Sequence, residues 1–180
     1  MKIKKENTAL LIIDLQEKLI PSIYKFEDLL DNTIKLIKGC RILNIPIIVS
    51  EQYPKGLGKT IDLISNHLGD FQPITKTEFS CMENLEFQKH LKSFEKRNII
   101  VCGIEAHICV QQTVLDLMDK DYKPIIIYDC ISSRNKFNKK IAFKRMRDYG
   151  SDFTTCEGIL FELLLHSKSN EFKSISEIVK

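Results

Sequence analysis

Apolar residues follow two alternating patterns along the chain. Short, continuous runs rich in isoleucine and valine are separated by longer stretches in which apolar residues recur at helical spacing. The runs predict strands over residues 9–14, 46–50, 98–103 and 124–129, with shorter ones over 71–75 and 152–156. Because the runs are continuous, both faces of each strand are expected to be buried, as in a parallel sheet covered by helices.

Helical spacing predicts helices over residues 28–43, 60–68, 107–120, 136–147, 159–165 and 172–179. A further helix is expected to start at Ser80, where Ser-Cys-Met-Glu matches a capping box, and to run towards Phe94. Residues 51–58 are rich in turn formers and predict a loop. Strands that alternate with helices indicate an open three-layer α/β domain. Because no repeat, low-complexity tract or linker interrupts the pattern, we expect one domain over residues 1–180.

Composition and charge give no indication of a nucleic-acid or membrane partner. The chain has 180 residues, 43% of them hydrophobic, and a net charge of +3, which is too small to indicate a nucleic-acid partner. The basic residues within 136–147 alternate with apolar ones and indicate a solvated helix face. The first apolar run is too short for a secretory signal, and no stretch reaches transmembrane length. A cytoplasmic protein without a membrane partner is expected.

Cysteine and histidine spacing argues against a metal or a cofactor. The six cysteines form no C-x-x-C pair, and the four histidines show no metal-binding spacing. Gly58-Lys59-Thr60 resembles the end of a P-loop, but that motif would need glycine at the position of Tyr53. The dinucleotide-binding motif G-x-G-x-x-G does not occur either. We therefore expect free thiols, no metal and no cofactor. The cysteines are Cys40, Cys81, Cys102, Cys109, Cys130 and Cys156.

Candidate chemistry lies where strands end. Ligands of open parallel sheets bind at the carboxyl ends of the strands. Asp14 closes the first strand, and Cys109 falls in the first turn of a helix that follows another strand. Helix N-termini stabilise thiolates, and no other cysteine is placed in this way. From the residues alone, Asp14 could equally cap a helix, Cys109 could equally pack under the sheet, and Lys76 could be a solvated charge.

Three segments change that balance: LLIIDLQ at 10–16, TKTEFS at 75–80 and VCGIEAHICV at 101–110. Together they resemble the isochorismatase-like cysteine hydrolases, the superfamily that includes nicotinamidases and N-carbamoylsarcosine amidohydrolases. SEQYPKGLG at 50–58 is similar to the branch of isochorismatase domain-containing proteins. The resemblance covers nearly the whole chain. It implies a six-stranded, mostly parallel Rossmann-like sheet with helices on both sides.

The resemblance also implies the site residues. Asp14, Lys76 and Cys109 match the catalytic triad of the superfamily. A non-proline cis peptide bond is implied between Ile104 and Glu105, and it would aim the N–H groups of Glu105 and Cys109 into one oxyanion hole. Four further residues neighbour the triad in sequence or lie at the same sheet edge, and each could line the substrate pocket or simply pack. They are Gln16, Tyr53, Phe79 and His107.

Two departures from relatives narrow the implied activity. Nicotinamidases carry a metal site with several histidines in and after the second strand. The corresponding residues 50–54 of this chain contain no histidine. Isochorismatases of siderophore and phenazine pathways lack a cysteine at the position of Cys109. Neither nicotinamidase activity nor vinyl-ether hydrolysis of isochorismate is therefore expected.

The expected function is hydrolysis of a small amide or related C–N bond through a thioester on Cys109. Lys76 and the helix N-terminus would lower the pKa of the thiol, and Asp14 would take its proton. Three alternatives stay open: a binding or scaffold protein on the same fold, a thiol redox sensor that pairs Cys109 with Cys81 or Cys102, and isochorismatase-type hydrolysis. The expected partner is a small-molecule substrate, and a homo-oligomer is expected because family members commonly form dimers or larger assemblies.

Overall fold

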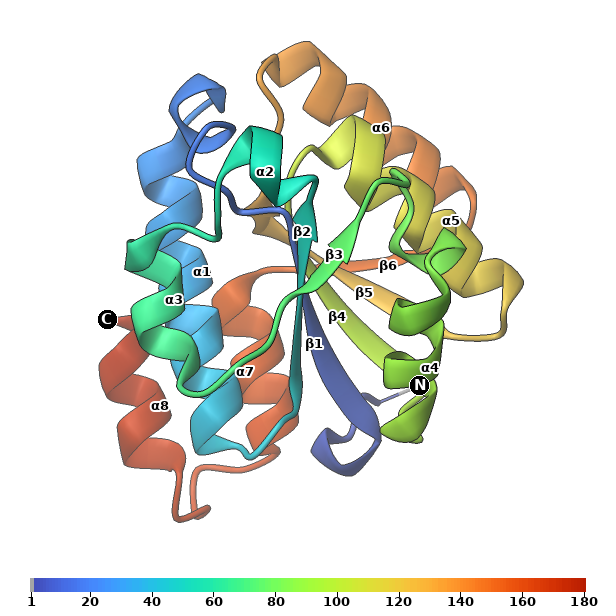
Figure 1. Cartoon of the computed structure of the whole chain (residues 1–180). Coiled ribbons are helices and arrows are strands. Elements are labelled where there is room, and N and C mark those ends of the chain that lie inside the picture. The colour runs from blue at the N-terminus through green and yellow to red at the C-terminus, as the bar shows by residue number, and fades with distance from the viewer. Residues whose placement is uncertain (1) are drawn as a thin grey trace.

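A computed structural model describes residues 2–180 and has one central β-sheet (Figure 1). Its strands are β1 (Thr8–Ile13), β2 (Ile47–Gln52), β3 (Ile74–Lys76), β4 (Asn98–Gly103), β5 (Lys123–Ile131) and β6 (Asp152–Thr154). They lie in the order β3-β2-β1-β4-β5-β6, and every neighbouring pair is parallel. The predicted α/β class is confirmed. Strand order reverses between β1 and β4, so this is where the fold favours a ligand site.

Helices cover both faces of the sheet (Figure 1). One face carries α1 (Phe26–Ile42), α3 (Asp62–Leu68), α7 (Cys156–Leu164) and α8 (Phe172–Val179). The other carries α4 (Leu85–Ser93), α5 (Gln111–Asp119) and α6 (Lys136–Asp148), while the short α2 (Pro54–Leu57) follows β2. A π-helical turn (Ala106–Val110) leads directly into α5. Within residues 2–180, no helix has the length and hydropathy needed to cross a membrane.

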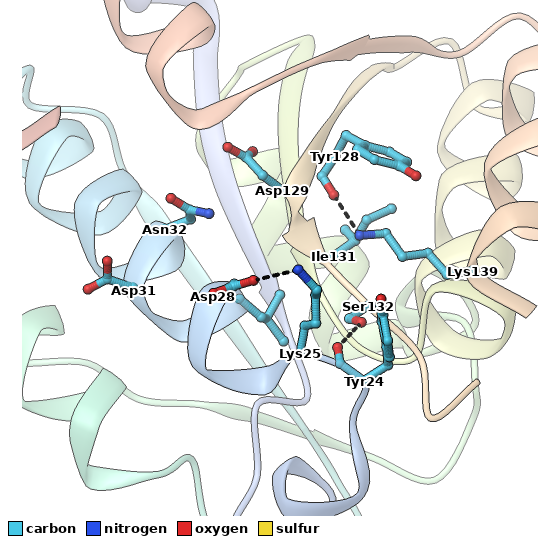
Figure 2. A pocket seen from close by; sticks show the side chains of 11 residues that line it. Tyr24, Lys25, Asp28, Asp31, Asn32, Tyr128, Asp129, Ile131, Ser132 and Lys139 are labelled. Atoms are coloured by element: carbon cyan, nitrogen blue, oxygen red, sulfur yellow. Dashed lines mark hydrogen bonds and ion pairs between the residues drawn. The ribbon is translucent and has the colours of Figure 1, made fainter. Parts of the chain in front are cut away.

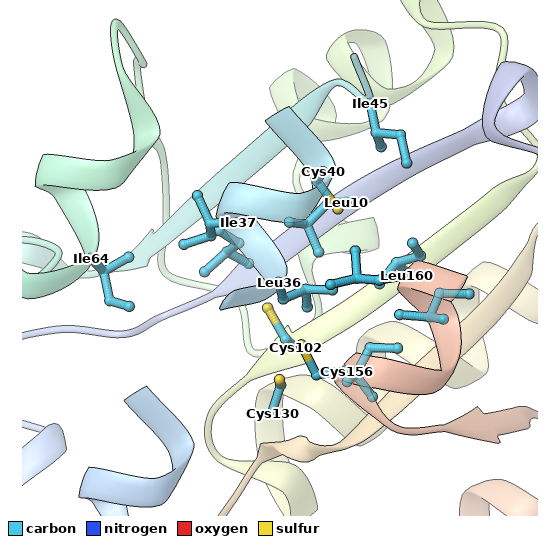
Figure 3. Packing of buried hydrophobic residues seen from close by; sticks show 14 of the residues in the cluster. Leu10, Leu36, Ile37, Cys40, Ile45, Ile64, Cys102, Cys130, Cys156 and Leu160 are labelled. Carbon is cyan, nitrogen blue, oxygen red and sulfur yellow. The ribbon is translucent and has the colours of Figure 1, made fainter. Parts of the chain in front are cut away.

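The core consists of two layers separated by the sheet. Leu10 and Ile12 of β1 point into the layer under α1, and Leu11 and Ile13 point into the layer under α5. All six residues of β1 are buried, as its continuous apolar run predicts. Each fully buried leucine or isoleucine contributes about 1.5–3 kcal/mol relative to an exposed one. Figure 3 shows the first layer, where Leu10 packs with Leu36.

Local structure differs from the sequence prediction at β3, which starts at Ile74 rather than at Phe71, and more clearly at residues 51–58 and near Ser80. Residues 51–58 are not a plain loop, since Glu51 and Gln52 extend β2 and Pro54 starts a four-residue helix. The capping box at Ser80 is also wrong, because the Ser80 hydroxyl accepts from the N–H of Met82 and closes only a 3-10 turn. The α4 helix begins later, where the Asn84 side chain accepts from the N–H of Phe87.

Candidate active site

Three strand ends bring Asp14, Lys76 and Cys109 to one place. Asp14 follows β1, Lys76 is the last residue of β3, and Cys109 lies in the π-helical turn after β4. The Lys76 Nζ donates to the Asp14 Oδ2 at 2.7 Å, and both side chains are only 1% exposed. The Cys109 thiol lies within range of both charges, since Asp14 raises its pKa and Lys76 lowers it. The fold thus assembles an ammonium, a carboxylate and a thiol in one buried cluster.

Neighbouring side chains fix the orientation of this ion pair. The Ser50 hydroxyl donates to the Asp14 Oδ1 at 2.7 Å, so both carboxylate oxygens have a partner. The Lys76 Nζ also donates to the Gln52 Oε1 at 2.6 Å. The parallel register explains these contacts, because Ser50 pairs with the end of β1 and Gln52 with Lys76 on β3. Asp14 is therefore held as a buried anion and caps no helix.

Burial and charge set the protonation states at this site. Burial lowers the pKa of Lys76, but the carboxylate of Asp14, and then the thiols of Cys81 and Cys109, outweigh burial and raise it. Lys76 is therefore an ammonium at neutral pH. Burial first, and the Asp14 carboxylate second, raise the pKa of the Cys109 thiol far above its usual range, while Lys76 opposes them. The thiol is neutral at rest.

The expected low pKa of Cys109 is thus wrong. Lys76 does favour the thiolate, but its charge is already matched by Asp14 at 2.7 Å. The thiol faces the carboxylate of that pair as well as the ammonium, and it is itself buried. A thiolate would add a second anion beside Asp14 in a site from which water is largely excluded.

The turn before Cys109 has a backbone that few residues could adopt. Gly103 has φ +121°, and a Cβ on it would collide with the main chain of Ile13. The next peptide bond, Ile104–Glu105, is cis. The Glu105 carboxylate accepts from the N–H of Arg134 at 2.9 Å and pairs with the Arg134 side chain at 3.0 Å. The backbone N–H of Glu105 has no hydrogen-bond acceptor among residues 2–180.

Comparison with known proteins now decides the family. A family model described as the isochorismatase domain matches residues 8–158. The chain belongs to the isochorismatase family. Isochorismatase domain-containing protein 2 of Danio rerio is 37% identical over 179 residues, which cover 99% of this chain and 89% of that protein. These matches confirm the resemblance inferred from the sequence.

Solved structures with a similar fold support the same family assignment. The MAR1 ribonuclease from Caenorhabditis elegans superposes with a TM-score of 0.93 at 38% identity, covering 99% of this chain and 92% of that one. YcaC from Escherichia coli, described as an octameric hydrolase of unknown specificity, gives a TM-score of 0.93 at 20% identity, with 99% and 89% covered. The second likeness concerns the fold alone. The chain is thus an isochorismatase-family protein with a hydrolase fold.

Among the four candidate pocket residues of this isochorismatase-family chain, two are held in hydrogen-bond networks. Gln16 is fully buried, and its amide bonds three main-chain groups of Gln52 and Gly58. It fixes the segment that follows β2. The His107 Nδ1 lies 3.0 Å from the Ser133 hydroxyl, and its Nε2 lies 3.3 Å from the Asn138 amide. This ring ties the π-helical turn that contains Cys109 to α6.

The other two candidates flank Lys76 and reach the surface. The N–H of Tyr53 donates to the Lys76 carbonyl at 2.9 Å, and the Phe79 carbonyl accepts from the Lys76 Nζ at 3.3 Å. Their side chains are 53% and 56% exposed. Tyr53 and Phe79 therefore lie largely at the surface, next to the strand end that carries Lys76.

The strand-end rule drew attention to the residues from Ser50 onward, but the sequence assigned no role to Ser50, Gln52 or Arg134. Ser50 and Gln52 could have been found, because parallel register places the end of β2 beside Asp14 and Lys76. Arg134 follows β5 in a loop, and no pattern predicts its pairing with Glu105. Within residues 2–180, no three histidine, cysteine, aspartate or glutamate side chains are grouped so that they could hold a metal ion.

Proposed function

We propose that this isochorismatase-family chain is a cysteine-dependent hydrolase of a small amide or related C–N bond. Cys109 is the nucleophile, Asp14 the general base and acid, and Lys76 the cation that keeps Asp14 ionised. The observation that carries the proposal is the buried Lys76–Asp14 pair beside the thiol. Replacing a buried ion pair by apolar residues often leaves stability unchanged or improves it. Such a pair in contact with a nucleophile is accordingly a candidate for chemistry.

The first half of the reaction forms an acyl-enzyme. As the Cys109 Sγ bonds to the substrate carbonyl carbon, Asp14 takes the thiol proton, so that no free thiolate is needed beforehand. The N–H groups of Glu105 and Cys109 hold the oxyanion, each contributing about 3–4 kcal/mol by analogy with other enzymes. Asp14 then passes the proton to the nitrogen, the C–N bond breaks and the amine leaves. A thioester remains.

The second half reverses the roles. Asp14 removes a proton from water, and the resulting hydroxyl attacks the thioester carbonyl. The C–S bond breaks, the carboxylic acid leaves and Cys109 recovers its proton from Asp14. The ammonium of Lys76 stays charged throughout. Between the two steps it stabilises Asp14 as a carboxylate, the form that can act as a base.

Acyl transfer to Cys109 tests this mechanism without knowledge of the natural substrate. The protein is treated with p-nitrophenyl acetate, and intact-mass and peptide analysis locate the acetyl group. We expect acetylation at Cys109, none in Cys109→Ala, and strong slowing in Asp14→Asn. Cys81→Ala is the matched control, because Cys81 shares the site but not the proposed role. Acetylation that persists elsewhere in Cys109→Ala with unchanged rate would overturn the proposal.

A screen for amide substrates should follow, scored by Cys109-dependent release of amine. Isochorismate is included to test vinyl-ether hydrolysis, and RNA is included because the C. elegans relative is called a ribonuclease. We expect turnover of a small amide and no turnover of isochorismate or RNA. If Cys109 forms no acyl-enzyme with any activated ester or amide, the binding-protein alternative replaces the hydrolase.

Redox sensing is a second candidate that one observation favours. Cys81 lies in the same core layer as Cys109 and its pKa responds to the same Lys76 and Asp14, whereas Cys102 points to the opposite layer. A redox pair would therefore be Cys81 with Cys109. Peroxide treatment followed by disulfide mapping tests it. A disulfide between these two residues would support sensing, and Cys109 oxidised without a disulfide would exclude it.

We further infer a homo-oligomer and a cytoplasmic location. YcaC of E. coli is described as octameric, and light scattering of the purified chain tests whether this relative's habit extends to it. All six cysteines are free thiols in the described chain, which suits a reducing compartment. Cell fractionation is the corresponding test.

A further inference from the structure

A cavity lies away from the triad, at the carboxyl end of β5. Its volume is about 360 Å³, and it is lined by residues at the start of α1, the end of β5 and one residue of α6 (Figure 2). Asp14, Lys76 and Cys109 do not line it. Its lining includes Tyr24, Asp28, Asn32, Tyr128, Asp129 and Lys139. The lining combines two aromatic rings with charges of both signs.

Most of the charged residues in the lining are matched by a residue close in sequence. Asp28 pairs with Lys25 at 3.3 Å, and Asp31 pairs with Lys35 at 3.7 Å. Asp129 and Lys139 differ, because neither forms an ion pair with any residue of the described chain. The cavity therefore presents one carboxylate and one ammonium whose charges are not matched by a contact.

Both groups have capacity for a ligand. The Lys139 Nζ donates one hydrogen bond, to the Tyr128 carbonyl at 3.1 Å, and lies 4.4 Å from the centre of the Tyr128 ring. The ammonium donates no other hydrogen bond to residues 2–180. The Asp129 Oδ1 accepts from the N–H of Cys156 at 2.9 Å, and the Oδ2 accepts nothing from residues 2–180. Figure 2 shows Lys139 reaching in from α6 and Asp129 at the adjoining end of β5.

Partial burial makes these free charges costly to leave uncompensated. Burial lowers the pKa of Lys139, although the charges of Asp129 and Cys130 oppose it. The ammonium is therefore less well solvated than a surface lysine. A bound anion would restore the lost stabilisation of the Lys139 ammonium.

We propose that this cavity binds a small zwitterion of the α-amino-acid class, with its carboxylate on the Lys139 Nζ and its ammonium on the Asp129 Oδ2. A simple anion would be attracted by Lys139 and repelled by Asp129, and a simple cation would meet the reverse. A molecule that carries both charges satisfies both groups. The rings of Tyr24 and Tyr128 offer apolar contact to its side chain.

Titration of the full chain, followed by amide NMR shifts, tests this assignment. The probes are glycine, L-alanine, L-leucine and L-phenylalanine, with acetate and methylammonium as half-ligands at matched ionic strength. We expect saturable shifts along residues 128–132 with at least one amino acid. Neither half-ligand should match its affinity. Loss of one charge-assisted hydrogen bond in Lys139→Met or Asp129→Asn should weaken binding roughly ten- to a hundredfold.

Three controls make the outcome decisive. Asp129→Asn retains the oxygen that accepts from Cys156, so the N–H at the start of α7 keeps its acceptor while the charge is lost. Lys140→Met makes the same charge change as Lys139→Met on an exposed neighbour and should not weaken binding. Cys109→Ala should bind as the wild type does, which separates this cavity from the proposed active site. The proposal is overturned if no amino acid binds, if acetate or methylammonium binds equally well, or if both charge variants bind normally.

Discussion

The two core layers hold the six cysteines in different surroundings. Under α1 and α7, four thiols lie among leucine and isoleucine side chains (Figure 3): Cys40, Cys102, Cys130 and Cys156. Under α5, Cys81 and Cys109 lie beside the Lys76–Asp14 pair. Burial does not separate the groups, because all six are buried. Nor does the direction of the pKa shift, since burial raises the pKa of Cys102 as well as that of Cys109.

The two groups of cysteines differ in whether a carboxylate and an ammonium lie near the thiol. The pKa of Cys102 is raised by burial and then by the thiols of Cys40 and Cys156. That of Cys109 responds in addition to a carboxylate that can receive its proton and an ammonium that favours the anion. A buried cysteine therefore becomes a candidate nucleophile through an adjacent base, even where its own pKa is high.

The largest expected contrast is in alkylation under native conditions. Cys109 is 7% exposed in the site, whereas Cys102 is fully buried in strand β4. Iodoacetamide should reach Cys109 without unfolding, while Cys102 must wait for the sheet to open, at a cost of about 5–15 kcal/mol. We expect alkylation of Cys102 to be at least about a thousandfold slower. Peptide mass spectrometry against time measures each residue separately.

Denaturant sharpens this test. Sub-denaturing urea should accelerate the reaction of Cys102, because its exposure requires opening, and should leave that of Cys109 almost unchanged. Similar rates for both residues, or the same urea dependence, would show that the two layers do not differ in the way described.

The fold was predictable because its strands are simple. Continuous apolar runs marked β1 and β4 within one residue at their ends, since strands buried on both faces carry no polar positions to confuse the pattern. The short β3 was displaced, because only three residues pair with β2 and no run of three is distinctive. The start of α4 was missed, because Ser80 and Asn84 are both good caps and only tertiary packing selects between them.

The resemblance predicted that three residues would meet at one sheet edge, but it did not predict their electrostatics, and their catalytic role stays a prediction. The resemblance pointed to Asp14, Lys76 and Cys109, and the sheet brings them together. The direction of the Cys109 pKa was wrong, because it depends on how deeply the thiol is buried and on which partner is nearer, and neither is written in local sequence. The contact between Arg134 and Glu105 was invisible for the same reason.

Breaking the ion pair should have the next largest effect. Lys76→Met leaves the Asp14 carboxylate buried without its cation, which costs about 3–5 kcal/mol of unfolding free energy. Urea unfolding followed by circular dichroism measures this loss. The matched control is Lys76→Met with Asp14→Asn, in which no uncompensated charge remains, so most of the stability should return. A single variant as stable as the wild type would mean that Asp14 is not held as a buried anion.

The smallest effect is the most specific to the proposed chemistry. A free cysteine titrates with a midpoint of about pH 8.5. In the wild type, the midpoint for Cys109 alkylation should lie above that value, since burial and then Asp14 raise the pKa of the thiol. Asp14→Asn keeps the shape and removes the anion, while the Lys76 ammonium remains. The thiolate is then favoured, and the midpoint should fall by roughly one pH unit or more.

Ser50→Ala supplies the comparison for that shift. It removes the hydrogen bond to the Asp14 Oδ1 and keeps the carboxylate charge, so the midpoint should move far less than in Asp14→Asn. The same Asp14→Asn protein should alkylate faster at neutral pH yet acetylate Cys109 more slowly, because the nucleophile gains anion while the base is lost. If the midpoint stays in place or rises in Asp14→Asn, Asp14 does not raise the pKa of the Cys109 thiol. The proposed difference between the two core layers would then be wrong.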